Sequence, residues 1–190
     1  MLSKFLGLKI LKLILNHLKK PNFLNALVYG YIRKSKAERS FEYAQILLRK
    51  NIGTPQPYAF YEKKTLLGLS ESYYFSEQQD IDLMFRNLIF DPNYPNRVEI
   101  IKQSANFFYK IHNLGIEFID NTAGNILITK VGENEYNFYL VDLNRMIFHK
   151  IGMHDDIAIN FYDVFIFSLS NRFIHDFWLL IAIIFMPNVN

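Results

Sequence analysis

Two β-rich runs joined by a short polar link constrain the fold of this chain more than any other feature. They occupy residues 125–131 and 136–142, and both are rich in the β-branched and aromatic residues that favour strands. The polar residues 132–135 between them predict an antiparallel hairpin. Because a hairpin brings the chain back to where it started, the end of the second strand should lie beside the start of the first.

Polar residues bracket this hairpin. Asp120 and Asn125 precede its body, and Asp142 and Asn144 follow it. Phosphoryl transfer depends mainly on positioning and on the neutralisation of charge by magnesium, a cation that prefers oxygen ligands. A helix, an Asp-x-x-x-x-Asn loop, a hairpin and a second Asp therefore predict a kinase site, with Asp120 as the base and Asn125 and Asp142 as the metal ligands.

The same residues also have a simpler interpretation. Asp and Asn are ordinary loop residues, and an Asp five positions before an Asn occurs by chance in many proteins. The context favours the functional interpretation, because Gly115 stands shortly before Asp120 and Asn125 opens a strand. An apolar run also leads directly into Asp142.

Composition restricts the chemistry further. The chain has 190 residues, of which 51% are hydrophobic, enough for one sizeable core in one compact unit or two docked lobes. It has no cysteine, which excludes disulfides, zinc–thiolate sites and thiol nucleophiles and suits a reducing cytoplasm. The net charge is only +3, but lysine and arginine concentrate near the N-terminus. This basic end is expected to face phosphate or an anionic membrane.

The N-terminal half predicts one helix followed by short strands. Ser35 and Glu38 form the pattern of a capping box at the start of a helix over residues 35–49. Residues 58–62 and 66–69 are expected to be strands that flank a turn. The turn is expected at Lys63 and Lys64, and a further strand over residues 72–75 is followed by a hinge over residues 77–80. One face of the helix over residues 35–49 is expected to carry Ala37, Phe41, Ala44 and Leu48.

Two further helices are predicted towards the C-terminus. The first lies within residues 95–115 and ends before Gly115, and His112 near its end is expected to cap or pack rather than react. The second covers residues 177–186, which are apolar but too few to span a membrane. No segment resembles a signal peptide, so we expect an intracellular protein. The expected buried face of the first helix comprises Val98, Ile101, Ala105, Phe108 and Ile111.

Residues 114–128 (LGIEFIDNTAGNILI) and 139–146 (YLVDLNRM) together resemble the catalytic and metal-binding loops of the lipopolysaccharide kinase family, especially its Bacteroidetes-like members. Residues 33–44 (RKSKAERSFEYA), followed by TPQP at 54–57, resemble the same family. The likeness covers about residues 18–150. It implies an α+β, protein-kinase-like fold with two lobes, which uses ATP and Mg²⁺ to phosphorylate an inner-core sugar, commonly Kdo or heptose.

The resemblance assigns roles to single residues. Asp120 matches the catalytic-loop aspartate, Asn125 the metal-binding asparagine, and Asp142 the aspartate of the D-F-G-like motif, here Asp-Leu-Asn. Glu42 matches the helix glutamate that pairs with the ATP-binding lysine, although it can equally be a surface charge on a basic helix. The implied parts are an amphipathic segment (1–18), a partial and reduced N-lobe (19–76), and a mainly helical C-lobe with the catalytic and metal-binding loops (77–190).

The chain departs from the family pattern in three places. The glycine-containing hairpin and the strand that ends in the ATP-binding lysine are not evident, because residues 1–18 have helical rather than strand character and the lysine position falls near Asn16. Phe118 stands where kinases often place a histidine. Only 48 residues follow Asp142, fewer than a full C-terminal lobe normally uses.

Three functions are consistent with these residues. The leading one is an ATP- and Mg²⁺-dependent phosphotransferase that acts on a lipid-linked sugar (lipid A or inner core) in the cytoplasm, with peripheral contact to the inner membrane and no nucleic-acid partner. The second is a catalytically impaired, pseudokinase-like binding module, which the missing lysine favours. The third is a small-molecule phosphotransferase of the aminoglycoside or choline type, which shares the fold and the spaced aspartates.

Overall fold

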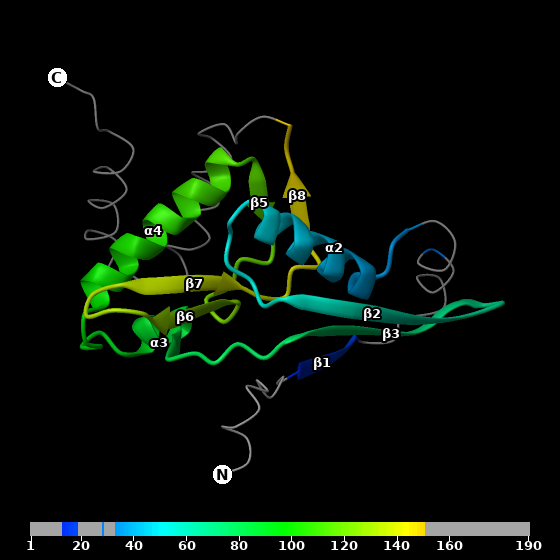
Figure 1. The fold of residues 1–190 in the computed structure, drawn as a ribbon, viewed down its shortest axis with the longest axis horizontal. Coiled ribbons are helices and arrows are strands. Elements are labelled where there is room, and N and C mark those ends of the chain that lie inside the picture. Colours follow the sequence, from blue (N-terminus) through cyan, green and yellow to red (C-terminus); the bar gives the residue numbers. More distant parts are fainter. Residues whose placement is uncertain (1–12, 19–27, 29–32, 151–190) are drawn as a thin grey trace, which may run out of the picture. The chain divides into compact units, whose positions relative to one another are not determined.

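Antiparallel strand pairing builds most of the structure, a computed structural model that describes residues 13–18, 28 and 33–150. Its first compact unit comprises the described residues up to Gln45 together with Pro55–Gln79. The second comprises Ile46–Thr54 and the described residues from Asp80 onward. Within the described residues, helices and small antiparallel sheets give an α+β architecture (Figure 1).

The first unit contains a sheet of three strands. Strand β3 (Gly68–Glu77) lies in the middle, with β1 (Leu13–Leu18) on one side and β2 (Pro57–Thr65) on the other. The helical character expected for residues 1–18 is wrong for β1, while residues 1–12 lie outside the described part. The reason is tertiary: β1 pairs along an edge of β3, with Asn16 opposite Tyr74, and this ladder outweighs the local pattern.

The β2–β3 hairpin turns later than the sequence predicted. Lys63 and Lys64 extend β2, and the chain turns at Leu66 and Leu67. Gly68 has φ 99°, a conformation that glycine adopts without strain, and the Thr65 hydroxyl donates to the Gly68 carbonyl at 3.3 Å. The turn is therefore fixed by residues that follow the lysines. The expected strands 66–69 and 72–75 also merge, because β3 is continuous.

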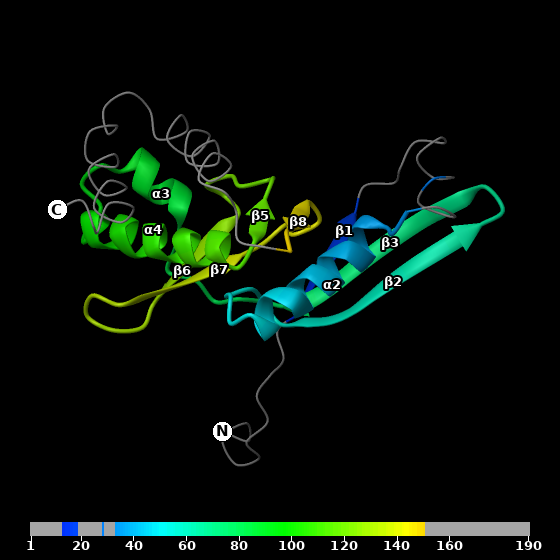
Figure 2. The same cartoon turned by 90° about the horizontal axis from the view of Figure 1, so that it is seen from above.

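Helix α2 (Lys36–Arg49) confirms the predicted helix. The Ser35 hydroxyl accepts a hydrogen bond from the Glu38 N–H at 3.1 Å, as the capping pattern requires. The Phe41 ring contacts the Phe60 ring of β2 at 5.4 Å between centroids, and Figure 2 shows α2 running alongside β2 and β3. The fully buried helix residues are Ala37, Ala44 and Leu47, so Leu47 rather than the expected Leu48 lies deepest.

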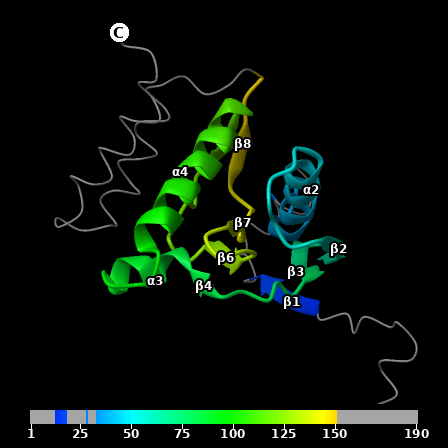
Figure 3. The same cartoon turned by 60° about the vertical axis from the view of Figure 1, so that its left-hand side comes forward.

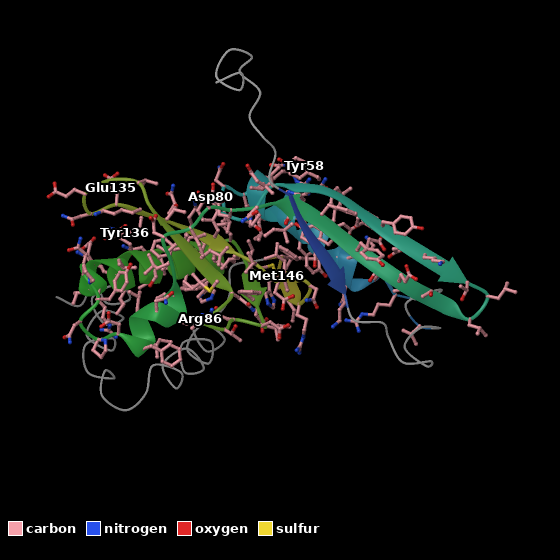
Figure 4. The ribbon with its side chains drawn as sticks, turned by 90° about the horizontal axis from the view of Figure 1, so that it is seen from below. Tyr58, Asp80, Arg86, Glu135, Tyr136 and Met146 are labelled. Atoms are coloured by element: carbon pink, nitrogen blue, oxygen red, sulfur yellow. The ribbon has the colours of Figure 1, made fainter. Side chains whose placement is uncertain are left out.

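The second unit contains the predicted hairpin. Strands β6 (Ile126–Lys130) and β7 (Tyr136–Leu140) are antiparallel, with Ile126 opposite Leu140, and β4 (Leu83–Met84) extends the sheet beyond β6. The Val131 N–H donates to the Glu135 carbonyl at 2.9 Å and closes the link. Glu135 and Tyr136 are labelled at this end of the hairpin in Figure 4.

Helix α4 (Arg97–Asn113) confirms the second predicted helix. It lies beside β5 and β7, and the Phe107 ring stacks on Phe138 of β7 at 5.5 Å. Figure 3 shows α4 next to β7. Val98 was expected on the buried face of α4 but is 68% exposed. The buried residues of α4 are Arg97, Ile100, Ile101, Ser104, Ala105, Phe108, Ile111 and His112. The short helix α3 (Phe85–Phe90) adds the buried side chains of Phe85 and Leu88.

A second, unexpected strand pair completes the unit. Strand β5 (Ile116–Phe118) pairs antiparallel with β8 (Met146–Phe148), with Phe118 opposite Met146. The His149 N–H donates to the Gly115 carbonyl at 2.7 Å and extends this pairing. The pair joins the segment before the Asp120 loop to the segment after Asp142.

The chain between α2 and β2 packs on the end of β7. The Leu140 N–H donates to the Gly53 carbonyl at 2.9 Å, and the Thr54 hydroxyl donates to the Leu140 carbonyl at 2.8 Å. A Cβ on Gly53 would lie 2.1 Å from the Phe138 carbonyl oxygen, so this approach requires glycine.

The described residues contain no helix that combines the length and apolar character needed to traverse a bilayer. The apolar residues 177–186, for which a terminal helix was expected, lie outside the described part of the chain.

Candidate active site

The loop between β5 and β6 carries Asp120 and Asn125. The Thr122 N–H donates to the Asp120 carbonyl at 2.8 Å, and the Asn125 N–H donates to the Thr122 carbonyl at 2.9 Å. The Asn125 side-chain Nδ2 also donates to the Asp120 carbonyl at 2.9 Å. These bonds fold the loop on itself and occupy the nitrogen of the Asn125 amide, so the oxygen of that amide is the atom suited to bind a cation.

The β6–β7 hairpin brings the Asp142 segment to this loop. The Val141 N–H donates to the Asn125 carbonyl at 3.0 Å, immediately before Asp142. Asp142 itself has φ 58°, in the left-handed region that residues other than glycine rarely occupy. Such a conformation costs about 1 kcal/mol or more and is often found at functional sites, where the surrounding structure maintains it.

Asn144 supports the Asp142 carboxylate. Its Nδ2 donates to Asp142 Oδ1 at 2.6 Å, and its side chain is nearly buried, with 5% of its surface exposed. The Asn144 Oδ1 atom is buried and has no hydrogen-bond partner within the described residues. An unpaired buried acceptor costs about 1–3 kcal/mol, and this one sits two residues from the proposed metal ligand.

Arg145, three residues after Asp142, contacts the Asp120 carboxylate. Its Nη1 lies 2.9 Å from Asp120 Oδ1, and its carbonyl accepts the Ile119 N–H at 3.2 Å. Sequence reasoning missed Arg145, because the contact depends on the β5–β8 pairing, which three-residue strands do not signal. The available signal was its place three residues after Asp142 in the metal-binding motif.

Asn121 is a second residue that the sequence did not single out. It follows Asp120 directly and is 7% exposed, and both polar atoms of its amide are buried without a hydrogen-bond partner among the described residues. Phe118, at the position where kinases often carry a histidine, is fully buried in β5. It therefore serves the core rather than the site.

His112 packs inside the second unit, as expected. It is 3% exposed near the end of α4, and burial lowers its pKa to about 4. The ring is therefore neutral at pH 7 and does not supply positive charge to the site.

Glu42 lies in the first unit and has a different partner from the one expected. Its carboxylate accepts a hydrogen bond from the Lys34 ammonium, and this bond is the main reason that the pKa of Lys34 is raised. The ATP-binding lysine was expected near Asn16, which lies in β1 opposite Tyr74. The fold thus provides a strand at that position, but β1 (LILNHL) contains no lysine.

The oxygen atoms at the two loops suit magnesium. No group of three or more His, Cys, Asp or Glu side chains capable of holding a metal occurs within the described residues. Asp142, Asn125 and Asn144 each carry a side-chain oxygen, the hard type of donor that magnesium prefers, and the Asn144 oxygen has no hydrogen-bond partner among the described residues. Magnesium usually takes only one or two protein ligands beside phosphate and water, so these residues fit it.

Comparison with known proteins identifies the fold. No family model and no curated protein sequence matches the chain. Among solved structures, a match with TM-score 0.50 and 14% identity covers 77% of this chain and 72% of the other, whose description is "WaaP in complex with acyl carrier protein". WaaP has a kinase-like fold.

The chain has a protein-kinase-like fold. The resemblance inferred from residues 114–128 and 139–146 is thus confirmed for the fold. In this kinase-like fold, the loop with Asp120 and Asn125 and the segment that starts at Asp142 are joined by the β6–β7 hairpin and by the β5–β8 pair. The roles of the individual residues remain predictions.

Proposed function

We propose that the protein is an ATP- and Mg²⁺-dependent phosphotransferase that phosphorylates a hydroxyl of an inner-core sugar of lipopolysaccharide, Kdo or heptose. The observation that carries this proposal is the convergence of two loops in a kinase-like fold. The Asn125 side chain donates to the Asp120 carbonyl, and the Asn125 carbonyl accepts a hydrogen bond from Val141, the residue before Asp142. Phosphoryl transfer requires one group to orient the hydroxyl and others to hold the metal, and these residues provide both.

Each residue has a defined task in this proposal. The acceptor hydroxyl oxygen forms a bond to the γ-phosphorus of ATP, the bond from that phosphorus to the ADP oxygen breaks, and the hydroxyl proton passes to the Asp120 carboxylate. Asn125 and Asp142 would hold magnesium, which neutralises phosphate charge when bound. Asn144 keeps the Asp142 carboxylate oriented through its hydrogen bond.

Label transfer tests the proposal directly. Purified protein with radiolabelled ATP, Mg²⁺ and a Kdo-bearing lipid A precursor should transfer label, and Asp120→Ala should lower the rate by at least about a hundredfold. Asp142→Asn should abolish Mg²⁺-dependent ATP binding, measured by calorimetry. Asp91→Asn is the matched control, because Asp91 lies at the end of α3 and accepts a hydrogen bond that Asn can also accept. Equal ATP binding by wild type and Asp142→Asn would refute the assignment of Asp142.

A binding module is the second candidate. It is favoured by Asn16 in the strand that should carry the ATP lysine and by the pairing of Glu42 with Lys34. Cationic clamps supply a large part of the rate of phosphoryl transfer, so their loss lowers activity more than binding. Mg²⁺-dependent ATP binding without transfer to any acceptor, including aminoglycosides and choline, would support this module. Transfer to aminoglycosides or choline alone would support a small-molecule phosphotransferase.

We also propose that the protein acts in the cytoplasm with peripheral contact to the inner membrane, through the tip of the β2–β3 hairpin. Leu66 and Leu67 are 94% and 63% exposed there, and Lys63 and Lys64 lie just behind them. Adjacent exposed leucines flanked by lysines suit a bilayer interface, where apolar side chains enter and ammonium groups meet phosphates. Each lysine also has a carboxylate neighbour, so the apolar tip supplies most of the expected affinity.

A further inference from the structure

Arg145 places a positive charge at the candidate base. Its guanidinium Nη1 lies 2.9 Å from Asp120 Oδ1, and its main chain is fixed by the Ile119 N–H bond and by the adjacent β8. The neighbouring Met146, labelled in Figure 4, is buried and holds β8 against β5. The guanidinium therefore starts from an ordered backbone on the Asp120 side of the site.

Most hydrogen-bond donors of Arg145 have no partner in the part of the chain that the structure describes. A guanidinium carries several N–H groups in a planar fork, and within residues 33–150 only the Nη1 contact with Asp120 engages them. The side chain is 57% exposed, compared with 27% for Asp120. Such a solvated pair contributes at most about 1 kcal/mol to stability.

The position of Arg145 relative to the reaction follows from its partner. A hydroxyl that gives its proton to Asp120 has its oxygen within hydrogen-bond distance of that carboxylate, and the transferred phosphoryl group is then bonded to this oxygen. The phosphoryl oxygens carry negative charge throughout transfer. A guanidinium that contacts the same carboxylate is therefore near enough to bind them.

We propose that Arg145 is a further catalytic residue, which binds the transferring phosphoryl group with the donors that Asp120 does not use. This inference rests on the proposed phosphotransferase function. In the step concerned, the acceptor oxygen bonds to the γ-phosphorus, the bond to the ADP oxygen breaks with its electron pair, and the proton moves to Asp120. Arg145 neither gains nor loses a proton and acts only through its charge and N–H donors.

The test separates binding of the ground state from binding of the transition state. Full-length wild type, Arg145→Gln, Arg145→Lys and the control Arg49→Gln are titrated with MgADP and with MgADP plus aluminium fluoride, which mimics a transferring phosphoryl group. Arg49 is a suitable control because it is an exposed arginine at the end of α2. Thermal unfolding of each variant checks that it is folded, and the weak contribution of an exposed pair predicts little change.

Arg145→Gln should weaken the aluminium fluoride complex by about a hundredfold while MgADP affinity changes by less than about threefold, the size expected for loss of one transition-state donor. Arg145→Lys should recover part of the loss, and Arg49→Gln should match wild type. Equal weakening of both complexes, or no weakening of either, would overturn the role of Arg145 while leaving the proposed function in place. Faster label transfer by Arg145→Gln would also overturn it, since the Arg145 guanidinium would then slow the reaction by occupying the Asp120 carboxylate. Failure of wild type to bind MgADP would overturn the function and this inference together.

Discussion

At the scale of the residue, the candidate site depends on how each carboxylate is held. Asp142 adopts a left-handed conformation and accepts a hydrogen bond from Asn144, and Asp120 is paired with Arg145. Both supporting side chains come from the tetrapeptide that begins at Asp142. The sequence predicted the acidic residues from their spacing, but not their supports, because those contacts arise from backbone geometry that spacing alone does not reveal.

The role of Asn144 can be tested at this scale. Asn144→Ala removes the 2.6 Å bond to Asp142 Oδ1, and the freed carboxylate should bind magnesium less well. Hydrogen bonds to charged groups contribute about 1.5–3 kcal/mol, so Mg²⁺-dependent ATP affinity should fall about tenfold or more. Calorimetry over a range of Mg²⁺ concentrations measures the shift. Asn137→Ala, an exposed position in β7, is the control, and an unchanged Mg²⁺ dependence in Asn144→Ala would exclude the positioning role.

At the scale of the element, sequence prediction succeeded where the signal was local. Helix α2 followed from the Ser35 cap and the helix periodicity, and the β6–β7 hairpin followed from two β-rich runs around a polar link. The β1, β5 and β8 strands were missed, because each pairs with a segment far away in the sequence, and β5 and β8 have only 3 residues each. Their stability comes from the partner strand rather than from their own residues.

The contact between Gly53 and β7 gives a test of element packing. Gly53→Ala would place a Cβ 2.1 Å from the Phe138 carbonyl oxygen, and neither backbone can move without breaking the Leu140 bond to Gly53. We expect a loss of about 1–3 kcal/mol in the free energy of unfolding, measured by urea denaturation. Gly124→Ala is the matched control, because its Cβ would approach only the end of the Arg86 side chain at 4.0 Å. Similar free energies of unfolding for the two variants would show that the Gly53 backbone is not packed tightly against the Phe138 carbonyl.

The hairpin tip provides a second test at this scale. Replacing Leu66 and Leu67 together by Ser should reduce sedimentation with vesicles of phosphatidylethanolamine and phosphatidylglycerol by at least about tenfold, since burial of each leucine contributes about 1.5–3 kcal/mol. Val131→Ser is the control, because Val131 is also exposed at a hairpin, the β6–β7 link. If both variants sediment like wild type, the tip does not contact the bilayer.

At the scale of the whole molecule, the kinase-like fold was predictable from the combination of motifs, whereas composition alone indicated only a protein with one sizeable core. Strand β1 was not predictable, because residues 1–18 have a helical pattern and only pairing with β3 makes Leu13–Leu18 extended.

Global stability should depend on pH through His112. Burial lowers its pKa in the folded protein to about 4, so below about pH 6.5 the unfolded chain binds a proton that the folded one excludes. The free energy of unfolding is therefore unaffected by protonation of His112 above about pH 6.5. It decreases as pH falls towards 4, by roughly 2 kcal/mol at pH 4.5. Urea denaturation at pH 7.0 and 4.5 measures it. His112→Gln should show a smaller difference between the two pH values than wild type, and an identical difference would show that other groups cause the acid sensitivity.

The left-handed backbone of Asp142 has an evolutionary consequence. Asparagine and glycine tolerate this conformation, whereas β-branched residues do not, so the routes by which a descendant could lose the carboxylate are few. A lineage that abandoned catalysis would first accept Asn or Gly here and would keep the loop shape long after the chemistry had gone.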